Sequence, residues 1–199
     1  MGASMSNPPL SDISEFATEY TLAVMMWNGA EMTAKRILIK MMGASSAAAA
    51  IVVDMGNRSL NEGLETYARE QTDAVLREHI AHFSKGFMTL LGYRNLYVHC
   101  LVGVAGPGLK APAGKVTGHI MQIKGGGRLR SMNRQVETAE IVEFKTSATD
   151  LFQYGVAIIN YMGDDLMTLP GMSAIIPPSL DKPAWPTPLQ NALSYHQAQ

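Results

Sequence analysis

Three residues near the middle of the chain, Arg94, Asn95 and His99, carry side chains that could act together on one phosphate group. A guanidinium group is permanently charged and donates paired hydrogen bonds to phosphate oxygens. An imidazole titrates near neutral pH, so it can take or give a proton during a reaction. An amide can orient either neighbour through hydrogen bonds. These residue types therefore favour chemistry on a phosphodiester.

The charge pattern around these residues also favours an anionic ligand. Residues 79–136 contain no Asp or Glu, but they include four His and eight basic residues. The basic residues are Lys85, Arg94, Lys110, Lys115, Lys124, Arg128, Arg130 and Arg134. The whole chain has 16 Lys and Arg against 17 Asp and Glu, so the remaining residues are strongly acidic. Such asymmetry predicts a local basic face rather than indiscriminate binding of nucleic acid.

Length and composition indicate a single domain, for which we expect no cofactor. A chain of 199 residues with 47% hydrophobic content can build a single core. Only 17% of the residues are charged and 14 are Met, which favours an additional buried face such as a homodimer interface. Cys100 is the only cysteine, so we expect no disulfide and a reducing, cytoplasmic location. The apolar run 47–53 is too short to cross a membrane, and no export signal is visible.

Apolar periodicity predicts the elements that must position these residues. Ser11 or Asp12 begins a long helix that ends at Gly43, and an Ala-rich helix covers about 44–55. The face of the first helix is formed by Ile13, Phe16, Tyr20, Ala23, Trp27, Ala30, Ala34, Leu38 and Met41. Ser59 and Glu62 form a capping box that predicts a third helix from about Leu60, bent or ended at Gly92.

A β-hairpin and a proline-rich tail complete the predicted organisation. Residues 119–124 and 128–132 are candidate strands around a Gly125–Gly127 turn, and Thr138 caps a last long helix. We therefore predict a mainly α, up-down helical bundle with one β-hairpin before the last long helix. The predicted organisation has three parts. They are a flexible N-terminal arm (1–10), the helical bundle (11–168, with the hairpin at about 119–132) and an extended tail (169–199). Trp185 suggests that the tail is anchored to the body.

The run Arg94-Asn95-x-x-x-His99 resembles the R-x4–6-H signature of the HEPN superfamily of compact helical bundles. The surrounding layout is similar to that of a group of uncharacterised bacterial HEPN-like proteins. Shared features are a first helix with Trp27 and Glu31, a basic hairpin, a last helix and a Pro-rich tail around Trp185. The likeness covers most of residues 11–190. Leu101 stands where HEPN toxins often place a tyrosine.

This resemblance implies a metal-independent endoribonuclease, acting as a homodimer in a toxin or phage-defence setting. His99 would be the general acid or base for attack by the RNA 2′-hydroxyl, Arg94 would hold the phosphate, and Asn95 would orient the pair. On a continuous helix Arg94 would point about 140° away from His99, which favours a second copy completing the site. An antitoxin or other protein partner is a further expectation. Nucleic-acid contacts are expected at Lys124, Arg128, Arg130 and Arg134.

Several alternatives remain open at this point. The chain could be a non-catalytic HEPN-like module that binds RNA or protein, or a helical assembly subunit with Met-rich faces. Arg94, Asn95 and His99 could also only cap helix carbonyls or bind a buried carboxylate such as Glu31. Glu31 would otherwise be a solvated side chain. His79 and His82 have metal-ligand spacing, but no third ligand is near, so no metal site is predicted.

Overall fold

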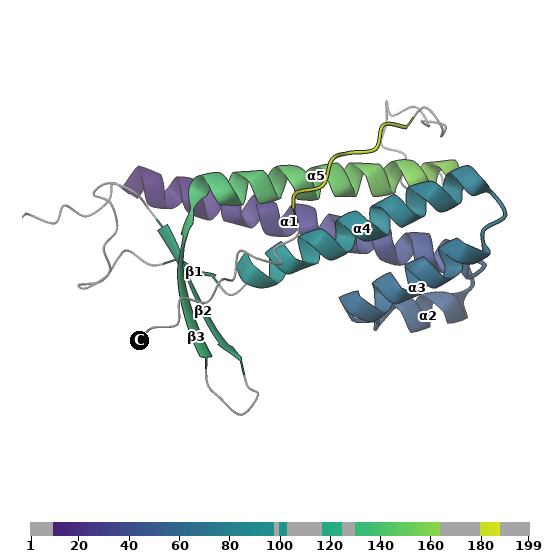
Figure 1. Ribbon diagram of the computed structural model, residues 1–199, viewed down its shortest axis with the longest axis horizontal. Coiled ribbons are helices and arrows are strands. Elements are labelled where there is room, and N and C mark those ends of the chain that lie inside the picture. The colour runs from purple at the N-terminus through teal and green to yellow at the C-terminus, as the bar shows by residue number, and fades with distance from the viewer. Residues whose placement is uncertain (1–9, 98–99, 103–116, 125–129, 164–179, 188–199) are drawn as a thin grey trace, which may run out of the picture. The chain divides into compact units, whose positions relative to one another are not determined.

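The computed structural model describes residues 10–97, 100–102, 117–124, 130–163 and 180–187, with side chains over 13–97, 136–163 and 180–187 (Figure 1). This part of the chain is mainly helical, as predicted. Its elements are α1 (Leu10–Met41), α2 (Ser46–Val53), α3 (Asn57–Glu70), α4 (Ala74–Tyr97), β1 (Cys100–Val102), β2 (Thr117–Lys124), β3 (Arg130–Glu137) and α5 (Thr138–Tyr161). The predicted arm, Arg128, His99 and most of the tail lie outside the described residues.

Gly43 and Ser45 mark the end of α1 and the start of α2. Gly43 adopts a positive φ of 88° just after α1, a conformation that glycine reaches without a steric penalty. Ser45 then caps α2, because its hydroxyl accepts a hydrogen bond from the Ala48 amide at 3.1 Å.

The start of α3 corrects the predicted capping box. This helix already begins at Asn57, so Ser59 lies inside it, and Glu62 accepts a hydrogen bond from Arg58 Nε at 3.2 Å instead. The i,i+4 geometry of a helix brings Arg58 and Glu62 together, and this ion pair replaces the capping interaction.

Residues 71–73 separate α3 from α4. Asp73 begins the new helix, since its Oδ1 accepts hydrogen bonds from the Val75 and Leu76 amides at 2.9 and 3.1 Å. At the other end, the predicted stop at Gly92 is wrong, because α4 continues to Tyr97. A single glycine costs a helix only about 1 kcal/mol, which the packing of Leu96 and Tyr97 offsets.

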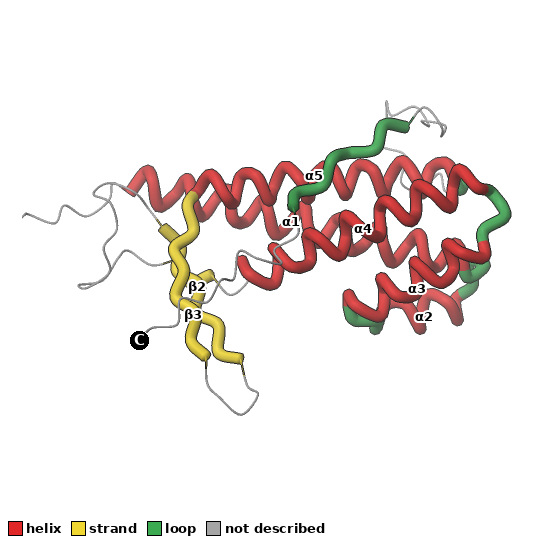
Figure 2. The backbone as a smooth tube through the Cα atoms, in the orientation of Figure 1, coloured by secondary structure: helices red, strands yellow, loops and turns green. Residues whose placement is uncertain are grey.

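The predicted hairpin is present and belongs to a three-stranded antiparallel sheet with the order β1-β2-β3 (Figure 2). The strands β2 and β3 pair from Thr117 with Glu137 to Lys124 with Arg130. The sequence analysis did not predict β1, which adds three residues to the free edge of β2. No loop separates β3 from α5, which begins at Thr138 as predicted.

The chain divides into two compact units, which we describe separately. The sheet-bearing unit comprises residues 1–25, 92–146 and 189–199, and the helical unit comprises 26–91 and 147–188. In the sheet-bearing unit, the buried side chains include Phe16, Leu96, Tyr97, Val136 and Ile141.

In the helical unit, α1, α4 and α5 meet at close range around small residues. Trp27 of α1 stacks on Phe87 of α4, with ring centroids 5.0 Å apart. A Cβ added to Gly155 of α5 would lie 2.5 Å from Thr33 Oγ1 and 2.7 Å from Phe83 Cε2. The absence of a side chain at Gly155 therefore allows the three helices to pack closely.

The described tail residues, Leu180–Thr187, form neither helix nor strand, in accord with the predicted extended tail. None of the helices within the described ranges has an apolar stretch long enough to cross a membrane.

Candidate functional site

The last turn of α4 carries Arg94 and Asn95, and buried aromatic packing holds it in place. The rings of Tyr97 and Phe144 are 5.4 Å apart, and those of Tyr93 and Tyr97 are 6.2 Å apart. Because Tyr97 is 4% exposed, this turn is fixed against α5 within the sheet-bearing unit. A cation in the last turn also interacts favourably with the negative end of the helix dipole.

Arg94 has a guanidinium group that the protein satisfies only in part. Its Nη1 donates a hydrogen bond to Asn95 Oδ1 at 3.1 Å, so the two neighbouring residues do act as a pair. Its Nε is buried and has no hydrogen-bond partner among the described residues. A buried donor without a partner costs about 1–3 kcal/mol, and an anion that accepts a hydrogen bond at this position would remove that cost.

His99 lies outside the described residues, but the elements on either side of it are described. The helix α4 ends at Tyr97 and β1 begins at Cys100. The described helix therefore ends two residues before His99, and the described strand begins one residue after it. The angle of about 140° between Arg94 and His99 holds only for a continuous helix, which the structure describes no further than Tyr97.

The sheet register brings one predicted RNA-contacting position close to the motif. Cys100 of β1 pairs with Ile120 of β2, which pairs in turn with Arg134 of β3. Adjacent strands are about 4.8 Å apart, so the backbones at Cys100 and Arg134 lie roughly 10 Å apart in one row across the sheet. This row starts one residue after His99.

Two other predicted RNA-contacting positions lie together at the far end of the hairpin. Lys124 is directly opposite Arg130 in the β2–β3 register. The pair is four residues along β3 from Arg134, roughly 13 Å at about 3.3 Å per residue. The fourth predicted position, Arg128, is outside the described residues.

Glu31 pairs with Lys35, whereas the sequence suggested a contact with Arg94, Asn95 or His99. Its carboxylate lies 3.1 Å from Lys35 Nζ, one turn further along α1, and 25% of each side chain is exposed. Lys35 Nζ also donates a hydrogen bond to the Val53 carbonyl at 3.2 Å. Glu31 therefore helps to join α1 to α2 within the helical unit.

The histidines with metal-ligand spacing are occupied by other interactions. His79 Nδ1 lies 2.6 Å from the Tyr154 hydroxyl, and His82 Nε2 lies 2.8 Å from the Pro183 carbonyl oxygen. Burial lowers the pKa of His79, with a smaller contribution from Lys182, and burial raises the pKa of Tyr154. No group of three potential metal ligands occurs in the described part of the chain.

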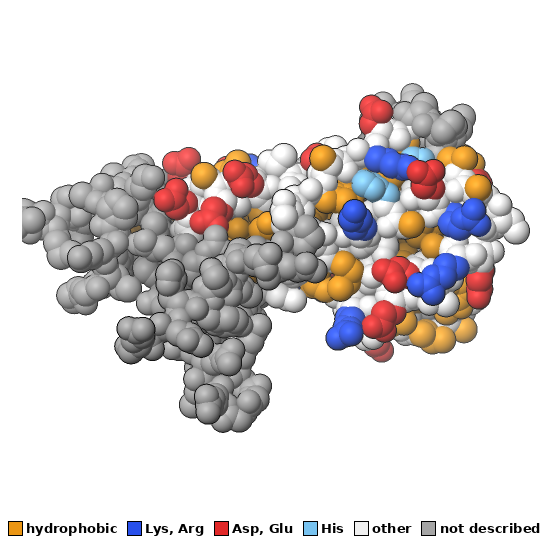
Figure 3. All heavy atoms as spheres, viewed as in Figure 1, with side chains coloured by type: hydrophobic (Ala, Val, Ile, Leu, Met, Phe, Trp, Pro, Cys, Tyr) orange, Lys and Arg blue, Asp and Glu red, His pale blue; other side chains and the backbone are white. Residues whose placement is uncertain are grey.

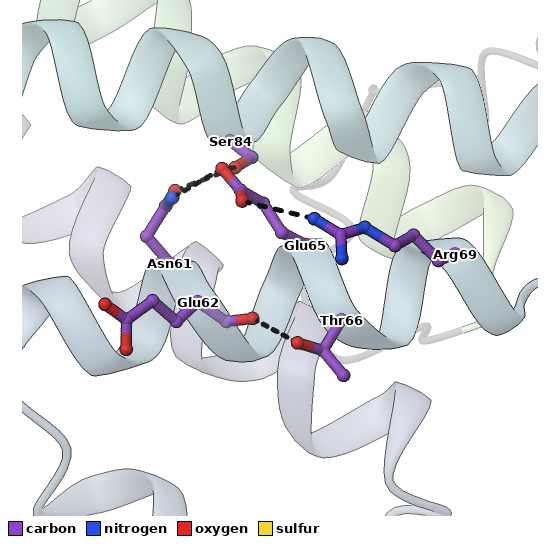
Figure 4. Close-up of polar contacts among 6 residues, drawn as sticks. All are labelled: Asn61, Glu62, Glu65, Thr66, Arg69 and Ser84. Carbon is purple, nitrogen blue, oxygen red and sulfur yellow. Dashed lines mark hydrogen bonds and ion pairs between the residues drawn. The ribbon is translucent and has the colours of Figure 1, made fainter.

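Sequence reasoning missed a polar network between α3 and α4. Figure 4 shows Asn61, Glu65 and Ser84 in mutual contact. Ser84 donates a hydrogen bond to Asn61 Oδ1 at 2.8 Å, and Asn61 Nδ2 donates one to Glu65 Oε1 at 3.0 Å. Ser84 is 1% exposed and is therefore a structural contact rather than a nucleophile. In the sequence, only the polar residues on an otherwise apolar face of α4 could have indicated this network.

Acidic and basic side chains are interspersed with hydrophobic ones over α3 and α4 on the face shown in Figure 3. This part of the described surface therefore shows no basic field of the kind that binds nucleic acid.

Comparisons with known proteins add no identification. The chain matches no protein-family model, no curated protein and no solved structure.

Proposed function

We propose that the sheet-bearing unit binds RNA at the junction of α4 and β1 and cleaves it without a metal ion, as the HEPN-like resemblance implies. The observation that carries this proposal is the buried Nε of Arg94, which has no hydrogen-bond partner in the described part of the chain, whereas Nη1 donates to Asn95 Oδ1. A phosphate oxygen is the ligand that would complete the hydrogen bonding of such a guanidinium group.

The proposed reaction is an internal transesterification. His99 acts as general base and takes the proton from the ribose 2′-hydroxyl as O2′ forms a bond to phosphorus. The P–O5′ bond breaks, and the leaving oxygen takes a proton from a general acid. The products are a 2′,3′-cyclic phosphate and a 5′-hydroxyl. Arg94 stabilises the charge that builds up on the phosphate oxygens, and Asn95 holds Arg94 in orientation.

A second copy of the chain is the proposed source of the general acid. One imidazole cannot both accept the first proton and supply the second within a single concerted step. Two His99 side chains, one from each copy of a homodimer, would provide both groups. This part of the proposal rests on the chemistry of the reaction.

The experiment is an RNA cleavage assay in the presence of EDTA. A fluorescently labelled RNA oligonucleotide should give products that end in a 2′,3′-cyclic phosphate, and His99→Ala should reduce the rate by about 10²–10⁴-fold. His196→Ala is the matched histidine control and should cleave at the wild-type rate. Cleavage that persists in His99→Ala would exclude His99 from the mechanism.

A second candidate, RNA binding without cleavage, is favoured by the register of the hairpin. Lys124 lies directly opposite Arg130 in the β2–β3 register, so two basic residues occupy one end of the hairpin, where phosphate groups of RNA could bind. On this alternative, the chain binds RNA with an affinity that falls steeply with salt but yields no products. Lys124→Gln together with Arg130→Gln should then reduce the salt dependence by about two counterions. An unchanged salt dependence would exclude the hairpin from binding.

A further inference from the structure

The described tail residues, Leu180–Thr187, lie against α4 and α5 of the helical unit as an extended peptide (yellow in Figure 1). We call these residues the tail segment. Their contacts come from both side chains and backbone, and they involve polar, aromatic and charged groups. The segment has the chemistry of a ligand seated on a receptor surface, which makes the surface beneath it a candidate binding site.

Trp185 is the anchor of the tail segment. Its ring stacks on His82, with centroids 5.1 Å apart and planes 28° apart, and it meets Tyr154 edge-on at 6.2 Å. Its Nε1 donates a hydrogen bond to the His82 carbonyl at 3.0 Å. Aromatic anchors of this kind dominate the binding energy of many peptide and protein interfaces.

Gly86 creates the space for this anchor. A Cβ added at Gly86 would overlap the indole ring, with Trp185 Cζ2 only 2.7 Å away. Any larger residue at this position would therefore expel the indole. We call the surface formed by His82, Gly86 and Tyr154 the tryptophan pocket.

The residues that precede Trp185 orient the tail segment through a backbone hydrogen bond and an ion pair. His82 Nε2 donates a hydrogen bond to the Pro183 carbonyl at 2.8 Å, since a carbonyl oxygen can only accept. Lys182 forms an ion pair with Glu78, and this contact lowers the pKa of Glu78. Proline-rich peptides that dock on aromatic side chains are a known mode of peptide recognition, and Trp185 between Ala184 and Pro186 packs on the rings of His82 and Tyr154 in this way.

We propose that the tryptophan pocket is a docking site for the tail segment of a second copy of the chain, so that exchange of tails links two copies. The contacts described above require the pocket and the segment but not a covalent link between them. Residues 164–179, sixteen in all, connect α5 to the segment. An extended chain of that length reaches roughly 50 Å, ample to reach a neighbouring copy. Glu78 and Lys182 are complementary charges that would pair equally well between copies.

The chain's own tail competes with exchange, because a short tether gives it an effective concentration in the millimolar range. The exchanged form should therefore increase with protein concentration. Domain exchange of an identical element is a low-cost route to a dimer. This inference concerns the helical unit and does not depend on RNA cleavage.

Two full-length variants test the proposal by sedimentation over a range of protein concentrations. Trp185→Ala keeps the pocket but removes the anchor, and Gly86→Leu keeps the anchor but blocks the pocket. Wild-type protein should form dimers increasingly as its concentration rises, and each variant alone should lose at least about tenfold in dimer affinity, or about 1.4 kcal/mol. A mixture of the two variants should recover dimers, because the intact tail of Gly86→Leu can enter the intact pocket of Trp185→Ala.

Lys85→Leu adds an apolar side chain at an exposed neighbouring position on α4, and it should dimerise as wild type does. Wild-type protein that stays monomeric throughout, or variants that each dimerise as well as wild type, would overturn the proposal. If Gly86→Leu fails to fold, a labelled peptide of residues 179–190 replaces it. That peptide should bind Trp185→Ala more tightly than wild type, and no binding to folded Trp185→Ala would equally overturn the proposal.

Discussion

The buried polar groups of the helical unit differ from the guanidinium group of the sheet-bearing unit in how far the protein satisfies them. His79 bonds to Tyr154, and the buried Asn61 and Ser84 bond to each other, while Asn61 also bonds to the exposed Glu65. Arg94 has a buried Nε with no partner among the described residues. The comparison shows that histidine and arginine residues in one basic sequence region have different roles. The former stabilise helix packing, while the latter retains unused hydrogen-bonding capacity.

The lack of a hydrogen-bond partner does not by itself distinguish Arg94 from the helical unit. Trp27 Nε1 and Asn160 Oδ1 in the helical unit are also buried without partners within the described ranges. Both belong to neutral side chains, for which the cost is about 1–3 kcal/mol. Arg94 adds a full positive charge, so an anionic ligand gains more there than at either neutral group.

The largest expected effect is on Arg94 itself. Arg94→Ala should reduce RNA cleavage by about 10²–10³-fold, because it removes the group that stabilises the phosphate charge. Its free energy of unfolding should stay the same or rise, since an unpaired buried donor is lost. Single-turnover cleavage and urea unfolding measure the two quantities.

Arg77→Ala is the matched control, because Arg77 is an exposed arginine on the same helix. It should leave both quantities unchanged. A large loss of stability in Arg94→Ala would contradict the proposed difference between the two units. It would show that Arg94 has a structural role like that of the helical unit's polar groups.

The next largest effect is expected where helices of the helical unit approach most closely. Gly155→Leu should lower the free energy of unfolding by about 3 kcal/mol, because the new side chain would overlap Thr33 and Phe83. Urea denaturation measures this change. Gln153→Leu, at an exposed position on the same helix, should be nearly neutral, and an equal loss in both variants would contradict the packing argument.

A smaller effect is expected in the polar network between α3 and α4. Ser84→Ala should lower the free energy of unfolding by about 1–2 kcal/mol, because Asn61 Oδ1 loses its buried donor. Thr66→Ala removes an exposed hydroxyl that bonds to the Glu62 carbonyl, which Figure 4 also shows, and it should cost less. If the two variants lose equal stability, burial does not determine the strength of this network.

The smallest effect is expected from the titration of His79. Its pKa in the folded state is lowered from the ordinary value of 6.5, mainly by burial. The unfolded chain therefore binds this proton first, and stability should fall as the pH drops below 6.5 toward the lower folded pKa. His79→Gln should flatten the dependence of unfolding free energy on pH in that window, as measured by urea titrations at successive pH values. An unchanged slope would show that other groups are responsible.

The sequence predicted the buried side of α1 well, since apolar spacing and burial have the same cause. Phe16, Ala23, Trp27, Ala30 and Leu38 were all predicted on the inner face, and all are buried. The last helix also begins at the predicted residue. Local signals were less reliable, because the Ser59 and Glu62 pattern lies inside α3 and Gly92 does not end α4. Tertiary packing outweighs such signals when it stabilises a helix by more than a single residue costs.

The candidate site was predicted only as a set of residue types. Arg94 and Asn95 do form a pair, but Glu31 pairs with Lys35, and the chain enters a strand directly after His99. Partner choice depends on which side chains from distant segments come within about 3 Å, and spacing along the chain carries little information on that distance.

The sequence by itself determined the mainly helical class, the hairpin and the concentration of basic residues, because these depend on composition and short-range periodicity. Only the tertiary structure decided that His79, His82, Asn61 and Ser84 are satisfied within the fold while Arg94 Nε is not. It also placed Trp185 over Gly86. Hydrogen bonding and close packing are settled by distances between segments far apart in the chain, which fold together only when the whole core forms.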